Sequence, residues 1–257
     1  MYMQLNFKTF GQGFPVIILH GLLGSLDNWQ TIAKKLSEKF QVFIIDQRNH
    51  GKSPHSDEFN YSILSNDLLD FFLQHQIEKA HLIGHSMGGK AVMNFALEHS
   101  QRVGKLIVVD IAPSFYDDRH SEVFEALFSA DVKSATLRAG VEKMLRDKLN
   151  NDETTVQFLL KGLNRDKTGT HFEWKFNLES LYKHYTEISG AITSIKPFSG
   201  EALFIKGEKS LYINAENYLS IQQLFPDNKL VEIKGAGHWV HAEKPQQFTE
   251  EVIRFLS

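Results

Sequence analysis

The sequence predicts an α/β fold with a mostly parallel central sheet, helices on both of its faces and an inserted helical cap. Over residues 1–113, apolar and β-branched runs of strand length alternate with segments of helical periodicity. This alternation stops over residues 114–197, where helical patterns dominate, and it resumes over residues 198–257. We therefore expect a core formed by residues 1–113 and 198–257, with residues 114–197 inserted as the cap.

The core elements follow from the apolar runs. Strands are expected at residues 2–10, 16–19, 41–45, in the stretch leading into Ser86, and at 105–109, 202–205 and 230–233. Helices are expected after Ser25, from about residue 62, directly after Ser86, at 215–225 and from Pro245 to the end. The carboxyl ends of parallel strands form one edge, where ligands bind. We expect a single crevice there to receive His20, Asp46, Ser86 and Asp110.

The cap is expected to be helical and rich in aromatic residues. Helical patterns occur at residues 123–128, 137–145, 156–163 and 178–185. Between the last two, aromatic side chains stand at every second position from 172 to 176. They either pack the small core of the cap or line a substrate site.

The residues around Ser86 predict a strand, a sharp turn and a helix with the serine at the apex. Gly84, Ser86 and Gly88 form a Gly-x-Ser-x-Gly pattern between an apolar run and a helical one. A serine in such a turn has a strained backbone and points its hydroxyl away from the sheet. The two glycines are needed where helix and strand approach closely. We expect Ser86 to be a nucleophile, although a glycine-rich turn with an incidental serine has the same pattern.

A serine nucleophile needs a base and an oxyanion site. His238 lies on a glycine-rich loop after the last strand, which is where a base is expected in a chain ordered serine, acid, histidine. The oxyanion would accept hydrogen bonds from two backbone N–H groups, those of Met87 and Leu22. His85 is expected to be a packed neighbour. A metal pair of His238 and His241 is not expected, because no third ligand is close in sequence.

Composition excludes several other functions. The chain has 257 residues, no cysteine and a net charge of −3 with both signs interspersed, which argues against disulfides and against nucleic acid as a partner. No signal peptide and no membrane-spanning run is expected, so the expected location is the cytoplasm. We expect no cofactor and no metal, and the sequence leaves the oligomeric state open.

Asp46 and Arg48 are expected to brace a strand-end turn by hydrogen bonds or an ion pair rather than to take part in catalysis.

Several strings resemble known families. Ser86 within Gly-His-Ser-Met-Gly-Gly, the early His20-Gly21, the Asp-x-Arg-x-x-Gly-x-Ser of residues 46–53 and the late Gly237-His238 are together similar to the α/β-hydrolase fold superfamily. The strings at residues 48–51, 84–91, 110–113 and 235–245 more narrowly resemble the YbfF-type bacterial esterases.

The resemblance leaves the acid of the triad open. Most of the superfamily carries it on the loop after the strand that follows the cap, where this chain has Ser210. Some members place it at the end of the strand next to that of the serine, which here is Asp110. The resemblance therefore implies Asp110, with Glu208 or no strong acid as alternatives. Ser210 would complete a relay by a hydrogen bond to His238 or Asp110. Asp110 would otherwise only cap the turn after its strand.

The expected function is a serine hydrolase that cleaves a small-molecule acyl ester or thioester through an acyl-enzyme intermediate. Acyl-coenzyme A thioesters are implied by the family resemblance alone. A C–C bond hydrolase, a lyase-type relative or an aminopeptidase would use the same residues. The dehalogenase and epoxide hydrolase relatives are disfavoured, because they carry an aspartate where Ser86 stands. A binding protein that keeps this fold without turnover is the alternative outside enzymes.

Overall fold

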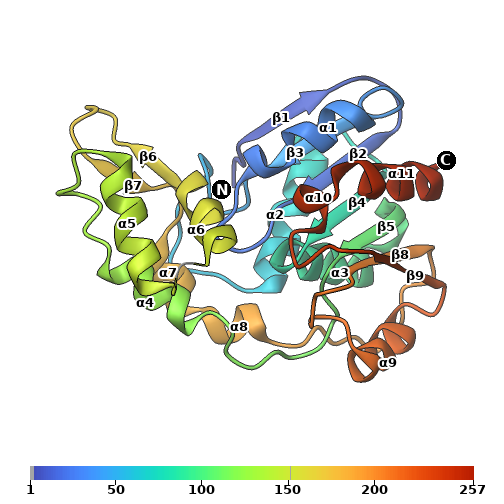
Figure 1. Ribbon diagram of the computed structural model, residues 1–257. Helices are drawn as coiled ribbons and strands as arrows, with labels where there is room; N and C mark the ends of the chain where they lie inside the picture. Colours follow the sequence, from blue (N-terminus) through green and yellow to red (C-terminus); the bar gives the residue numbers. More distant parts are fainter. Residues whose placement is uncertain (1–2, 151) are drawn as a thin grey trace.

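The computed structural model describes residues 3–150 and 152–257. Its main sheet has seven strands in the order β1-β3-β2-β4-β5-β8-β9, all parallel except β1, which runs antiparallel to β3 (Figure 1). The strands are β1 (Phe7–Phe10), β2 (Pro15–Leu19), β3 (Gln41–Ile45), β4 (Ala80–His85), β5 (Val103–Val109), β8 (Ala202–Gly207) and β9 (Asn228–Ile233). The predicted fold class is confirmed.

Helices cover both faces of the sheet because its central strands alternate between two apolar cores. In β2, Ile17 and Leu19 pack with one set of helices, whereas Val16 and Ile18 pack with the other. The first set is α2 (Tyr61–Gln74), α3 (Met87–Glu98) and α9 (Ala215–Leu224). The second set is η1 (Leu26–Trp29), α1 (Gln30–Leu36), α10 (Val240–Glu243) and α11 (Pro245–Leu256). A short turn, η2 (Ser100–Arg102), leads into β5.

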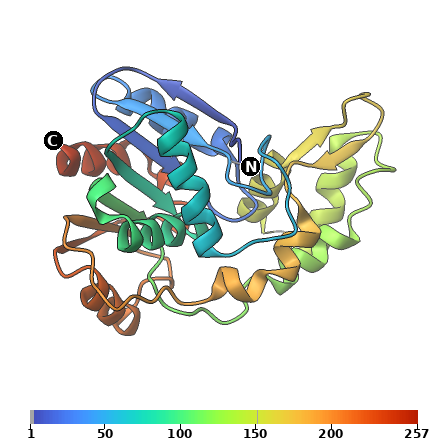
Figure 2. The same cartoon turned by 180° about the vertical axis from the view of Figure 1, so that it is seen from behind.

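The segment between β5 and β8 lies to one side of the sheet in both views (Figures 1 and 2). It contains α4 (Ser121–Ser129), α5 (Arg138–Lys148), α6 (Glu153–Lys161), β6 (Leu163–Arg165), β7 (Phe172–Trp174), α7 (Leu178–Lys183) and α8 (Tyr185–Ser189). The alternating aromatic stretch forms β7, which pairs antiparallel with β6. The last helical pattern is divided into α7 and α8 at His184.

Other differences from the sequence prediction concern the ends of elements. The first strand begins at Phe7 rather than at residue 2, which lies outside the described residues. The helix expected after Ser25 begins as a 3-10 turn, in which the Ser25 N–H donates to the Asn28 Oδ1 at 2.8 Å. Such ends depend on single capping contacts that periodicity does not encode. Across the described residues, none of the helices has the length and apolar character needed to cross a bilayer.

Candidate active site

Ser86 occupies the turn between β4 and α3 in a strained conformation. Its backbone angles are φ 52° and ψ −119°, and its N–H donates to the Val109 carbonyl at 3.0 Å. The two flanking glycines are needed for steric reasons. A Cβ on Gly84 would lie 2.2 Å from the Gly88 carbonyl oxygen, and a Cβ on Gly88 would lie 2.4 Å from that of His20. The turn therefore requires this spacing of small residues, as the sequence pattern predicted.

The side chains of Asp110, His238 and Ser210 meet at the ends of β5 and β8. His238 Nδ1 lies 2.7 Å from Asp110 Oδ2, and the Ser210 hydroxyl donates to the same oxygen. The Gly207 N–H donates to Asp110 Oδ1 at 3.0 Å. A carboxylate only accepts hydrogen bonds, so Nδ1 carries the hydrogen, and in the neutral imidazole Nε2 of His238 then has a lone pair. An imidazole in this state can take a proton from a hydroxyl group.

Glu208, the alternative acid, is engaged elsewhere. Its Oε2 accepts a hydrogen bond from the Gly235 N–H at 2.8 Å. This contact supports the turn after β9. Of the two candidate acids, Asp110 is the one that contacts the His238 ring. Asp110 is fully buried and has a positive φ of 54°, so a second strained residue stands beside Ser86 at this edge of the sheet.

His85 contacts the loop that carries His238. Its Nε2 lies 2.9 Å from the His238 carbonyl oxygen and must donate, because a carbonyl only accepts. Burial, followed by repulsion from His238 and His241, lowers the pKa of His85 well below its usual value. His85 is therefore a neutral support for the loop, consistent with a packed neighbour.

Two cavities meet at Ser86. The larger, of about 240 Å³, is bordered by Ser86, His238 and apolar side chains that include Phe158 and Trp239. The smaller, of about 30 Å³, is bordered by Ser86 and by Met87. Leu22 borders both. Met87 is the first residue of α3, and the first N–H groups of a helix have no partner within the helix.

The expectation that His20 and Asp46 share this crevice is wrong. The His20 ring is buried and accepts a hydrogen bond from the Gln47 N–H at 3.1 Å. Neither of them borders the two cavities at Ser86, and Asp46 lines a separate groove. The Asp46 carboxylate instead accepts hydrogen bonds from the backbone of Leu26 at 2.7 Å and Lys52 at 2.9 Å. Strand-end position brings a residue to the edge, but the direction of its side chain depends on such local partners.

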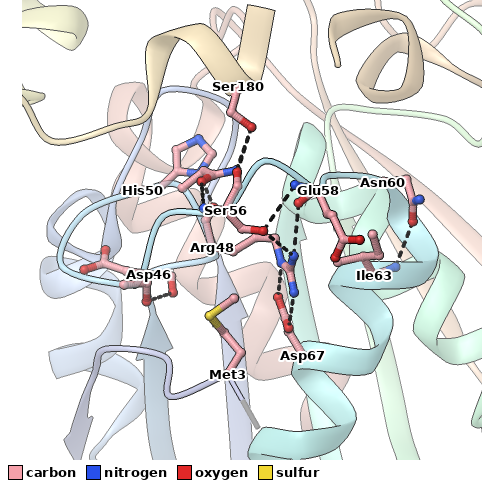
Figure 3. Close-up of polar contacts among 12 residues, drawn as sticks. Met3, Asp46, Arg48, His50, Ser56, Glu58, Asn60, Ile63, Asp67 and Ser180 are labelled. Atoms are coloured by element: carbon pink, nitrogen blue, oxygen red, sulfur yellow. Dashed lines mark hydrogen bonds and ion pairs between the residues drawn. The ribbon is translucent and has the colours of Figure 1, made fainter. Parts of the chain in front are cut away.

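Arg48 braces the long loop between β3 and α2 (Figure 3). Its guanidinium makes two hydrogen bonds to Asp67 on α2, of 2.5 and 2.7 Å, and one of 3.0 Å to the Glu58 carbonyl. The bracing role expected for Arg48 is confirmed, with Asp67 as its ionic partner. The same loop is fastened to α7, because the Asn49 amide donates to the Ser180 hydroxyl at 3.1 Å.

Sequence reasoning missed several polar residues that border the cavities, four of which are described here. Lys90 comes from α3, Arg119 and His120 from the segment before α4, and Tyr212 from the loop after β8. The Tyr212 ring stacks on that of His238 with centroids 4.1 Å apart. Lys90 lies one helical turn after Ser86, whereas Arg119, His120 and Tyr212 come to the cavities only through the tertiary fold, so no local pattern marks them.

His241 packs inside the core rather than at the cavities. Its ring stacks on Trp29 at 4.1 Å between centroids, and burial, followed by repulsion from His238 and Lys161, lowers its pKa to about 3. Among residues 3–150 and 152–257, no group of three or more histidine, aspartate or glutamate side chains is gathered as metal ligands.

The low pKa of His241 predicts a loss of stability in acid. In the unfolded chain this imidazole titrates near its usual pKa of about 6.5. Unfolding therefore takes up a proton once the pH falls below that value, and the native state loses stability down to about pH 3. The free energy of unfolding is measured with urea at pH 7 and at pH 5. Between these two pH values it should fall by about 2 kcal/mol less in His241→Asn than in wild type. His55 is exposed, so His55→Asn is the control and should show the same change in the free energy of unfolding as wild type. If this change were equal in all three proteins, His241 would not be the source of the acid sensitivity.

Comparison with known proteins places the chain in a family. A family model described as the alpha/beta hydrolase fold matches residues 15–245. The chain belongs to the α/β-hydrolase family. Esterase YbfF of Escherichia coli (strain K12) is 38% identical to this α/β-hydrolase over 244 residues, which cover 95% of the chain and 93% of that protein. The predicted resemblance to the family and to the YbfF-type esterases is confirmed.

Two further relatives of this α/β-hydrolase have names that refer to ester chemistry. An sn-1-specific diacylglycerol lipase, ABHD11, of Danio rerio is 39% identical over 264 residues, covering 98% of the chain and 82% of that protein. A solved structure described as a marine microorganism esterase is 42% identical and superposes with a TM-score of 0.95, covering 98% of this chain and 99% of that one.

Proposed function

We propose that this α/β-hydrolase cleaves carboxylic esters or thioesters, with Ser86 as nucleophile, His238 as base and Asp110 as the acid that orients the base. The hydrogen bond of 2.7 Å between His238 Nδ1 and Asp110 Oδ2 carries the proposal, because His238 and Ser86 border the same cavity. The family and the esterase and lipase names of the relatives support ester chemistry. Ser210 supports Asp110 through its hydroxyl.

The reaction proceeds in two acyl transfers. Ser86 Oγ forms a bond to the acyl carbon while His238 Nε2 takes its proton, and the carbonyl electron pair moves to the oxygen. This oxyanion accepts hydrogen bonds from the Leu22 and Met87 N–H groups, each of which contributes about 3 kcal/mol. The tetrahedral carbon then expels the alcohol or thiol, which takes the proton from His238. Water repeats the sequence and releases the acid from Ser86.

In this proposal residues 114–197 act as a cap over a core made of residues 1–113 and 198–257. Residues from the cap segment, including Val123, Phe158 and Leu159, border the larger cavity and give it an apolar wall. An apolar wall suits the hydrocarbon part of an ester. Besides water, the proposed chemistry uses only side chains and backbone groups of the chain. The cytoplasmic location expected from the sequence stays a prediction.

The proposal is tested with p-nitrophenyl esters from acetate to palmitate. We expect turnover with an initial burst of nitrophenol equal to the enzyme concentration, and an acyl group on the peptide that contains Ser86 when the reaction is quenched. Saturable binding of esters without turnover would instead support the binding-protein alternative. Turnover with the acyl group on another residue would remove Ser86 from the mechanism.

A further inference from the structure

Most polar side chains on the walls of the two active-site cavities are paired with other protein atoms. The Tyr61 hydroxyl donates to the Ile188 carbonyl at 2.7 Å, and the Tyr116 hydroxyl donates to the Tyr212 carbonyl at 2.6 Å. Three further wall residues donate in the same way: Lys90 to the carbonyls of Ser189 and Gly190, Thr155 to the carboxylate of Asp152, and Ser189 to the carbonyl of Thr186. A polar atom that stays open on these walls is therefore available to a substrate.

His120 borders both cavities and pairs only one of its two ring nitrogens. Its Nδ1 lies 2.7 Å from the hydroxyl oxygen of Tyr185. Within residues 3–150 and 152–257, its Nε2 forms no hydrogen bond. The protein does not enclose this nitrogen, since the buried side-chain atoms that lack a partner belong to Trp29, Gln47 and His241. His120 Nε2 is thus open to a ligand.

The hydrogen bonds of Tyr185 determine which nitrogen of His120 carries the hydrogen. The Arg119 backbone N–H donates to the Tyr185 hydroxyl oxygen at 3.2 Å. Among the described residues, the acceptor that remains for the hydroxyl hydrogen is His120 Nδ1. Burial, followed by repulsion from His238, lowers the pKa of His120 to about 4, so the ring is uncharged at neutral pH. In an uncharged imidazole whose Nδ1 accepts, Nε2 carries the hydrogen and is a donor.

We propose that the Nε2–H of His120 donates a hydrogen bond to an uncharged oxygen of the substrate, an ether or carbonyl oxygen close to the ester that is cleaved. A substrate that fills the cavity displaces water from Nε2. A hydrocarbon group at that place leaves the N–H unpaired, so an ester with an oxygen there is preferred. This inference rests on the proposed function, because it assumes that the ester is cleaved at Ser86.

The oxygen can belong to either half of the ester. Ser86 and His120 border both cavities, whereas His238, which must protonate the leaving group, borders the larger cavity and not the smaller. The leaving group therefore belongs in the larger cavity and the acyl group in the smaller. An oxygen on either half lies in a cavity that His120 borders, so the two halves are tested separately.

The experiment compares esters that differ by one ether oxygen in place of one methylene group. For the acyl half, 4-nitrophenyl methoxyacetate is compared with 4-nitrophenyl butyrate. For the leaving group, 2-methoxyethyl acetate is compared with butyl acetate, and acid release is followed at constant pH. The values of kcat/KM are measured for wild type, His120→Asn, His120→Gln and the control His171→Asn. Each variant is compared with wild type on the same ester, so differences in the reactivity of the esters cancel.

The two substitutions at His120 differ in where they place an amide. Asparagine places it near the position of Nδ1 and has no donor at the position of Nε2, whereas glutamine places an N–H near Nε2. His120 is the N-cap of α4, a position that asparagine favours, so we expect His120→Asn to fold. The control residue His171 lies in the cap segment, in the turn between β6 and β7, and borders neither cavity.

We expect His120→Asn to lower kcat/KM for the ether-containing member of at least one pair about fivefold to a hundredfold more than for its hydrocarbon partner, the size of one lost hydrogen bond. The pair that responds identifies the half of the substrate that carries the oxygen. His120→Gln should retain most of the preference for the ether, and His171→Asn all of it. Nitrogen NMR of the imidazole rings should show the hydrogen of His120 on Nε2, with its signals assigned by their absence from His120→Asn.

Two results would overturn the inference. One is a His120→Asn variant in which both members of both pairs change by the same factor, which would make His120 a support for Tyr185. The other is a wild-type His120 with its hydrogen on Nδ1. Hydrolysis of 4-nitrophenyl butyrate that depends on Ser86 would leave the proposed function intact in both cases. A wild type that hydrolyses none of the four esters would reject the function itself.

Discussion

Replacing Ser86 with alanine is expected to lower kcat for ester hydrolysis by about a millionfold. The variant loses the oxygen that attacks the acyl carbon, so neither the acyl-enzyme nor its hydrolysis can follow. Alanine keeps the Cβ of serine, and the strained φ of 52° is unchanged. We therefore expect a melting temperature close to that of wild type. The rates are compared by nitrophenol release at saturating ester.

Ser134→Ala is the matched control for this substitution. Ser134 is exposed in the segment between α4 and α5, and its hydroxyl hydrogen-bonds Asp131. Its variant should turn over esters at the wild-type rate. A Ser86→Ala protein that retained a tenth of the wild-type rate while correctly folded would reject the acyl-enzyme mechanism.

Replacing Asp110 with asparagine is expected to lower kcat by about ten-thousandfold, since an amide can hold the imidazole of His238 in the wrong tautomer. In wild type the carboxylate accepts from His238 Nδ1 at 2.7 Å, which leaves Nε2 free to act as base. The amide NH₂ of asparagine donates instead, which favours a hydrogen on Nε2. Because the side chains are nearly the same size, the change should appear in kcat more than in KM.

Glu208→Gln separates this role from a general effect of lost charge. Glu208 accepts a hydrogen bond from the Gly235 N–H, and a glutamine oxygen can do the same. Its variant should stay within a few-fold of wild type. The assignment of Asp110 would be wrong if Asp110→Asn kept nearly full activity while Glu208→Gln lost about a thousandfold or more.

The mostly parallel sheet could be predicted because its central strands are buried on both faces. β2 and β5 end in runs of valine, isoleucine and leucine, the pattern of a strand that is covered on both faces. The ends of elements were less predictable, since the start of η1 depends on the contact between Ser25 and Asn28. The hairpin β6–β7 was not predicted, because three-residue strands carry too little periodicity.

The candidate site was predictable where backbone geometry restricts the residue type. Only very small residues fit at Gly84 and Gly88, so the pattern around Ser86 could be recognised in the sequence. Arg119 and Tyr212 carry no such restriction. They lie before and after most of the chain between β5 and β8 and meet where the guanidinium of Arg119 lies over the ring of Tyr212, a long-range contact that spacing along the chain does not encode.

The ends of β5 and β8 both reach the carboxylate of Asp110. Ser210 donates to one of its oxygens and the Gly207 N–H to the other, and His238 Nδ1 contacts the same oxygen as Ser210, so a side chain at position 210 already lies beside the group that orients the base. In evolutionary terms this allows the acid to move between strands by two single substitutions.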